Sequence, residues 1–117
     1  MSRRSYQLAE QIKEVVATTL THMTDPRLEL ITVTAVGISP DLSHAKVYWT
    51  AFNVDEARRK IIQEALTGAK GYLRREIAQN LTVRAVPNLV FYYDNTMDVL
   101  EETSVLLEKV KKEDQKR

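Results

Sequence analysis

Two glycines three positions apart are the residues of this sequence best placed to bind a ligand. Gly68 and Gly71 interrupt a helical pattern within Thr67-Gly68-Ala69-Lys70-Gly71-Tyr72. Glycine inside a helix costs about 0.5 to 1 kcal/mol relative to alanine, so the pair predicts a break. A G-x-x-G turn between two helices can clamp single-stranded nucleic acid, because the following helix offers free N–H groups to phosphate. The pair therefore indicates a phosphate-binding turn between two helices.

A purely structural interpretation of the same glycines stays open. Gly68 could cap one helix, and Gly71 could let the next helix pack closely. The G-x-x-G pattern alone is too common to decide, and by itself it favours this structural interpretation.

Basic residues near the glycines favour RNA. Lys70 and Arg74 share a helix face at i, i+4 spacing, and Arg75 follows them. We predict that RNA contacts the following residues: Arg3, Arg4, Arg58, Arg59, Lys60, Ala69, Lys70, Gly71, Arg74, Arg75 and Arg84. The alternative is that these cations are solvated and paired with carboxylates such as Glu64 and Glu76. Charge alone does not separate the two, because a phosphate site requires convergence in space.

Net charge gives only mild support to a nucleic-acid partner. The chain of 117 residues carries a net charge of +1; residues 1–93 hold 12 basic and 9 acidic side chains, a net +3. RNA binding must therefore depend on local clustering. Tyr48, Phe52 and Tyr92 could stack on bases from an exposed sheet face, although packing within the sheet is the favoured interpretation.

Catalytic and metal-binding patterns are not found in the sequence. There is no cysteine, and His22 and His44 lack the spacing of metal ligands or of a catalytic triad, so we interpret both as surface residues. Carboxylates such as Asp41, Asp94 and Asp98 fit turn and cap positions. We therefore expect no enzyme, no metal, no cofactor and no small-molecule substrate.

Hydrophobic periodicity predicts the elements that position these residues. A first helix carries Leu8, Ile12, Val16 and Leu20 and ends at Asp25-Pro26. Two strands follow, and we predict that Ile31, Val33 and Ala35 face one way in the first of them. A second helix is predicted from a cap at Asn53, with Ala57, Ile61, Ala65 and Leu66 on its core face. After the break at Gly68, Ala69 and Gly71, a helix resumes through Leu73 and Ile77.

The chain then forms a third strand, 89–93, and a final helix, 96–110. The order predicts an α+β domain, residues 1–110, with helices on one face of a three-stranded sheet whose core includes Trp49, Leu89 and Phe91. Residues 111–117 are predicted to be a charged, flexible tail. No segment has the roughly 20 apolar residues of a membrane span, so we expect a cytoplasmic protein with no membrane partner, monomeric when free.

Four segments together resemble the ribosome-binding factor A family of bacterial small-subunit assembly factors. The resemblance covers about residues 2–107, and its segments are Asp25-Pro26-Arg27-Leu28, Asp41-Leu42-Ser43-His44-Ala45-Lys46-Val47, Ala69-Lys70-Gly71-Tyr72-Leu73-Arg74 and Pro87-Asn88-Leu89-Val90-Phe91-Tyr92-Tyr93-Asp94. Each segment is weakly specific alone, whereas their shared order and spacing are specific.

The resemblance implies a type II KH-like fold in which Ala69-Lys70-Gly71 forms a kink at the place of a G-x-x-G loop. It implies binding to the precursor of the 30S ribosomal subunit and its 16S rRNA, support of late rRNA processing, and importance for growth at low temperature. Because Gly68 precedes the kink, this sequence satisfies both patterns. Two other functions stay open: a general single-strand RNA binder, and a protein-interaction module that docks through the helix at 96–110.

Overall fold

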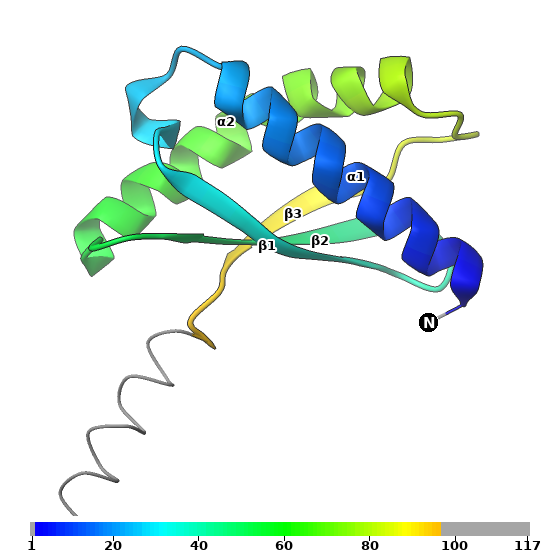
Figure 1. Ribbon diagram of the computed structural model, residues 1–117, viewed down its shortest axis with the longest axis horizontal. Coiled ribbons are helices and arrows are strands. Elements are labelled where there is room, and N and C mark those ends of the chain that lie inside the picture. The colour runs from blue at the N-terminus through cyan, green and yellow to red at the C-terminus, as the bar shows by residue number, and fades with distance from the viewer. Residues whose placement is uncertain (1, 97–117) are drawn as a thin grey trace, which may run out of the picture.

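A computed structural model describes residues 2–96 of the chain, with two long helices on one face of a sheet (Figure 1). The elements are α1 (Arg3–His22), the short 3-10 helix η1 (Pro26–Leu28), β1 (Ile31–Ile38), β2 (His44–Ala51), α2 (Glu56–Asn80) and β3 (Asn88–Tyr93). The sheet order is β1-β2-β3, with β1 antiparallel and β3 parallel to β2. The predicted α+β class and three-stranded sheet are confirmed. The predicted tail, and all but the first residue of the final helix, lie outside the described residues.

The core forms where the sheet meets the helices. Ala45 pairs with Leu89 and Val47 with Phe91 across the β2–β3 ladder, and all four side chains are buried. Because side chains alternate along a strand, Lys46, Tyr48 and Tyr92 point to the opposite, uncovered face. Trp49 is 1% exposed, and its ring meets that of Tyr93 edge-on at 5.1 Å. The core predicted for β2 and β3 is therefore confirmed.

Helix α1 has the predicted buried face and ends at His22, shortly before the predicted end at Asp25-Pro26. Ser2 caps its N-terminus by accepting a hydrogen bond from the Ser5 amide, and Ile12, Val16 and Leu20 lie on the buried face. Beyond the helix, the Asp25 side chain accepts from the Arg27 amide and caps η1, which has proline at its first position. Residues 23–25 therefore separate α1 from η1, and β1 follows.

Helix α2 is continuous, so the predicted break into two helices is wrong. It runs from the cap at Asp55 to Leu81, and neither Gly68 nor Gly71 has a positive φ. Burial of Ile62, Leu66, Leu73 and Ile77 stabilises the helix on both sides of the glycines and offsets their low helix propensity. What remains of the predicted kink is a change of direction near the middle of α2, where α1 passes in front of it (Figure 1).

Three local predictions are also wrong. A bulge between Val33 and Ala35 lets the alternation slip by one residue, so Ala35 is exposed and Val36 is buried. The cap of α2 is Asp55 rather than Asn53, because the Asp55 carboxylate accepts from the Arg58 amide. The buried face of α2 begins at Ile62, whereas Ile61 is 40% exposed and Ala57 lies in solvent.

Alanine should stabilise the helix at either glycine. A Cβ added at Gly68 or Gly71 meets nothing within 4 Å, and both residues lie inside α2. We expect G68A and G71A each to raise the free energy of unfolding by about 0.5 to 1 kcal/mol, because glycine loses more backbone entropy on folding. Urea denaturation measures the change. Ala78→Gly, at an exposed position of the same helix, is the matched control and should lower stability by a similar amount.

Candidate nucleic-acid interface

The exposed side of α2 carries lysine and arginine side chains beside glycine backbone that has no side chain to cover it. Lys60, Arg74 and Arg75 are exposed, as are both glycines, and this face is opposite the buried Ile62, Leu66 and Leu73. Gly68 and Gly71 have open space where a side chain would begin. Lys70 lies at the edge of this face, four residues after the buried Leu66 and three before the buried Leu73. We call the whole set the α2 basic face: Lys60, Gly68, Lys70, Gly71, Arg74 and Arg75. A phosphate could approach the helix backbone here more closely than over any other residue type.

The cations of the α2 basic face are not neutralised by the carboxylates proposed as their partners. Within residues 2–96 the recorded salt bridge is Arg27–Asp25, at 2.7 Å, and neither Glu64 nor Glu76 forms one with Lys70 or Arg75. Arg74 is held differently, because its Nη2 donates to the Val86 carbonyl oxygen at 3.0 Å. That bond fixes Arg74 beside the loop before β3 and leaves its positive charge without a carboxylate partner in the described part of the chain.

Continuity of α2 also changes how phosphate could be bound. The amides near Gly68 and Gly71 lie inside a helix, where N–H groups bond to carbonyls four residues earlier. The helix N-terminus expected to cradle a phosphate is therefore not present at this position. Ala69 is 7% exposed and its side chain belongs to the core, so its contact with RNA stays a prediction. Lys70, beside it, is half-buried.

Arg58, Arg59 and Lys60 are adjacent in the sequence but have different surroundings in the structure. Arg58 and Lys60 are exposed at the first turns of α2. The Arg59 guanidinium instead lies 4.1 Å above the centre of the Tyr93 ring, a cation–π contact that joins α2 to the end of β3. Arg59 therefore has a structural role in addition to its charge.

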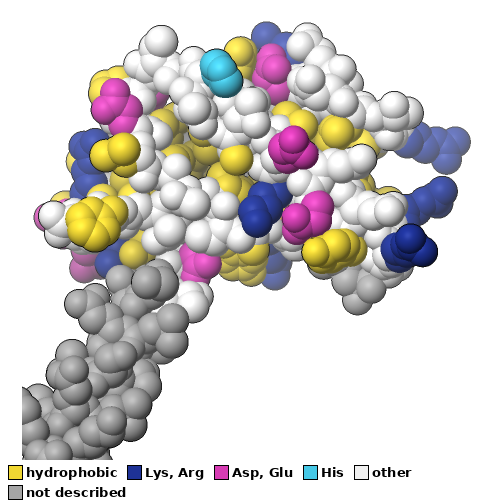
Figure 2. All heavy atoms as spheres, in the orientation of Figure 1, with side chains coloured by type: hydrophobic (Ala, Val, Ile, Leu, Met, Phe, Trp, Pro, Cys, Tyr) yellow, Lys and Arg dark blue, Asp and Glu magenta, His cyan; other side chains and the backbone are white. Residues whose placement is uncertain are grey.

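Arg4 and Arg84 lie at the other end of the molecule, although 80 positions separate them in the sequence. Both line a hollow of about 670 Å³ between the start of α1, the β1–β2 turn and the loop after α2. Figure 2 shows Lys and Arg side chains gathered at this end, on the right of the view. Both arginines are predicted from the sequence as RNA contacts, but their spacing along the chain does not place them together. Gln7, Leu8 and Leu42 share the hollow and are not predicted, because they carry no charge to mark them.

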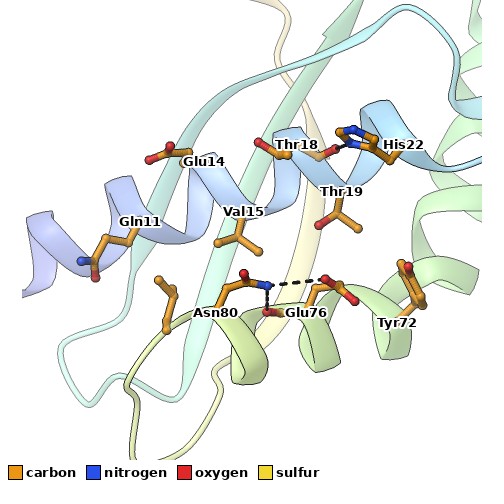
Figure 3. A pocket seen from close by; sticks show the side chains of 10 residues that line it. Gln11, Glu14, Val15, Thr18, Thr19, His22, Tyr72, Glu76 and Asn80 are labelled. Atoms are coloured by element: carbon orange, nitrogen blue, oxygen red, sulfur yellow. Dashed lines mark hydrogen bonds between the residues drawn. The ribbon is translucent and has the colours of Figure 1, made fainter.

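A second hollow, of about 530 Å³, lies between α1 and α2 (Figure 3). Glu14 lines it from α1 and Glu76 from α2, with Tyr72 and His22 at one end. The Asn80 amide donates to the Glu76 backbone carbonyl at 2.8 Å, which orders one wall. With two carboxylates and no lysine or arginine in its lining, this groove does not favour RNA phosphate.

The uncovered face of the sheet carries an aromatic pair. The rings of Tyr48 and Tyr92 lie 5.8 Å apart, and Tyr92 is 44% exposed. Phe52, predicted to share this face, is 92% exposed just beyond β2. The tyrosines therefore pack on each other outside the core, and base stacking on this face stays a prediction.

Among the titratable side chains of the described residues, Asp41 serves the β1–β2 turn. No group of three His, Asp or Glu side chains within residues 2–96 could hold a metal ion, and His22 and His44 are both exposed. Hydrogen bonds from Ser43 and Ser39 lower the pKa of Asp41 to about 2, so the β1–β2 turn keeps a charged carboxylate at neutral pH. Over the same residues, neither helix is long and apolar enough to cross a bilayer.

A profile of the family named Ribosome-binding factor A matches residues 4–107. The chain belongs to the ribosome-binding factor A family. Among its relatives, Ribosome-binding factor A of Pelobacter propionicus is 44% identical, covering 84% of this chain and 80% of that one. The Coxiella burnetii protein of the same name is 39% identical over 97% of this chain and 95% of its own length.

Solved structures of ribosome-binding factor A share this fold. The crystal structure from Thermus thermophilus is 34% identical, with a TM-score of 0.67 over 76% of this chain and 94% of that one. A solution structure from Thermotoga maritima, of a putative ribosome binding factor A, is 32% identical, with a TM-score of 0.70 over 79% and 88%. A homology model of Thermus thermophilus ribosome-binding factor A, fitted into a map of a 30S complex, matches with a TM-score of 0.64, 33% identity, and coverage of 77% and 94%. The type II KH-like fold implied by the four sequence segments agrees with these neighbours.

Proposed function

We propose that this chain is a non-catalytic ribosome biogenesis factor, which binds the 16S rRNA of immature 30S subunits in the cytoplasm. The observation that carries the proposal is the α2 basic face, whose cations form no salt bridge within residues 2–96 and flank exposed helix backbone. Phosphates could replace the counterions of these side chains, and release of those counterions drives association. The relative fitted into a map of a 30S complex supports the same partner.

Lys70, Arg74 and Arg75 are the central residues of the proposed interface. Lys60 extends the face toward the start of α2, and Arg58 is exposed nearby. Arg4 and Arg84, which line one hollow, and Arg3 at the start of α1 add a second basic surface. Gly71 contributes access to the backbone rather than a hydrogen-bond donor, since its amide lies within the helix.

Such a surface would hold rRNA in place rather than transform it. A protein that binds one RNA conformation shifts the population toward that conformation by its difference in affinity. We propose that binding keeps a segment of rRNA in a form competent for late processing and ends when maturation is complete. Misfolded RNA helices melt more slowly in the cold, so the same action would support growth at low temperature.

Sedimentation of a cell lysate tests the proposed partner. We expect the protein to migrate with immature 30S particles in a sucrose gradient and to leave that fraction after treatment with RNase. A general single-strand RNA binder would instead bind unrelated oligonucleotides with similar affinity and show no preference for immature subunits. Migration with a complex free of ribosomal RNA would contradict the proposal.

The glycine variants separate stability from recognition. If RNA approaches the backbone at Gly68 or Gly71, a methyl group there obstructs it while stabilising the helix. G68A and G71A should therefore bind immature subunits more weakly despite their higher stability, whereas A78G should bind normally. Unchanged binding of both alanine variants would remove the glycines from the interface.

A further inference from the structure

The hollow between the start of α1, the β1–β2 turn and the loop after α2 has the composition of a ligand site. Its volume of about 670 Å³ lies within the range of small-molecule pockets. Leu8, Leu42 and Val83 give it apolar walls, and Arg4 and Arg84 supply positive charge. Apolar walls with a few polar groups are the usual composition of sites for planar ligands.

The arginines at the start of α1 lie where they are unfavourable for the helix. Arg3 and Arg4 occupy its first turn, which has no acidic residue. The N-terminal end of a helix carries partial positive charge, so cations there are repelled. Sequences break such local rules mainly at functional sites. An anion beside Arg4 would relieve the repulsion.

Leu42 is also held in an unfavourable state. Its φ is 63°, in the left-handed region that glycine and asparagine adopt readily and leucine does not. Its amide donates to the Ser39 carbonyl oxygen at 2.9 Å, which closes the turn. The side chain is 40% exposed and lines the hollow. A leucine here adds apolar surface to the hollow, whereas a turn alone would be better formed by asparagine or glycine.

The hydrogen bonds of the β1–β2 turn go to one carboxylate oxygen of Asp41, Oδ1. Ser39 Oγ, Ser43 Oγ and the Ser43 amide all donate to Oδ1. None of these recorded bonds within the described chain uses Oδ2, although Asp41 also lines the hollow. An ionised carboxylate in this position can accept a hydrogen bond from a sugar hydroxyl.

We propose that this hollow binds one nucleoside monophosphate unit, supplied by an unpaired nucleotide of an RNA strand. The phosphate lies between Arg4 and Arg84, and the base lies against Leu42 and the other apolar walls. Asp41 accepts from the ribose. The identification of RNA as the source of the nucleotide rests on the proposed function. The recognition of a nucleotide by these side chains does not depend on it. A free mononucleotide presents the same groups.

Titration of the full chain with nucleoside 5′-monophosphates, followed by amide NMR shifts, tests the site. We expect AMP or UMP to shift the resonances of Gln7, Leu42 and Ala85, and to bind more tightly than either inorganic phosphate or the nucleoside. Arg84→Ala should weaken binding about tenfold or more, since a charge-assisted hydrogen bond is lost. Lys46→Ala removes one positive charge from the uncovered sheet face and should change nothing.

Leu42→Asn tests the site with a variant that is expected to fold normally. Asparagine tolerates the left-handed conformation, so this variant should be at least as stable as the parent yet bind the nucleotide more weakly. Shifts confined to α2, equal binding of inorganic phosphate alone, or full affinity in both Arg84→Ala and Leu42→Asn would overturn the proposal.

Oligonucleotides distinguish the source of the nucleotide and separate this site from the α2 basic face. A single-stranded RNA should compete with the mononucleotide, and the same RNA in a duplex should not. Arg84→Ala should weaken binding to immature 30S subunits by a similar factor. A loss of mononucleotide binding with subunit binding unchanged would rule out RNA as the source. Replacement of Lys70 and Arg75 should leave mononucleotide binding intact, even if the α2 basic face proves unimportant for subunits.

Discussion

Replacing Lys70, Arg74 and Arg75 together by alanine is expected to weaken binding to immature 30S subunits by one to two orders of magnitude at low salt. Each phosphate contact releases counterions and contributes roughly 0.7 to 0.9 to the slope of log affinity against log salt. The slope should therefore fall by about 2 to 3. Filter binding or fluorescence anisotropy over a range of salt concentrations measures both quantities.

Arg74 needs separate treatment because it also donates to the Val86 carbonyl oxygen. The double variant Lys70→Ala/Arg75→Ala avoids that bond, and Lys13→Ala/Lys46→Ala removes two charges outside the α2 basic face. We expect the first pair to lower the salt slope by about 1.4 to 1.8 and the second to lower it by less. Equal effects of the two pairs would mean that binding depends on the net charge of the protein rather than on the α2 basic face.

Trp49→Ala is expected to destabilise the protein by about 3 to 5 kcal/mol, which approaches the whole stability of a domain of this size. Trp49 is 1% exposed and packs on β1 through its pairing with Val33. Its Nε1 donates to Gln63 Oε1 at 2.9 Å, while Gln63 Nε2 donates to the Phe91 carbonyl oxygen at 2.6 Å. One side chain of α2 thereby links to two strands, and the substitution removes both volume and that link.

Trp49→Phe separates the two contributions. Phenylalanine retains most of the packing but leaves Gln63 Oε1 without its donor, which should cost about 1 to 3 kcal/mol. Guanidinium denaturation followed by far-UV circular dichroism is the suitable measurement, because Trp49 is the only tryptophan and its fluorescence would be lost. If the two variants are equally unstable, the hydrogen bond rather than packing holds α2 to the sheet.

Elements with strong periodicity could be predicted from sequence. The first helix, the second and third strands and the burial of Trp49, Leu89 and Phe91 follow from spacing alone. The break at Gly68 could not be judged in this way, because the helix is stabilised by packing of Leu66 and Leu73 against the rest of the fold. Tertiary contacts outweigh a propensity penalty of about 1 kcal/mol. The bulge near Ala35 had no sequence signal such as a glycine.

The candidate site could be predicted in residue type but not in arrangement. Lys70, Arg74 and Arg75 were selected by their nearness to the glycines, and they lie near the exposed backbone that the glycines leave. Ala69 was assigned to the same site because it belongs to the motif, whereas its position on the helix places it in the core. That Arg4 and Arg84 line the same hollow depends on how α1 packs beside α2, which spacing along the chain does not encode.

The continuity of α2 gives its cations a fixed spacing. Fifteen residues separate Lys60 from Arg75, which is about 22 Å along a helix that rises 1.5 Å per residue. Two helices joined by a flexible turn could adjust this separation to many RNA shapes. A continuous helix cannot, so RNA contacts both ends at once most readily when its phosphates match that separation. The fixed spacing of its cations would then let α2 distinguish one folded state of the RNA from another without contacting a base.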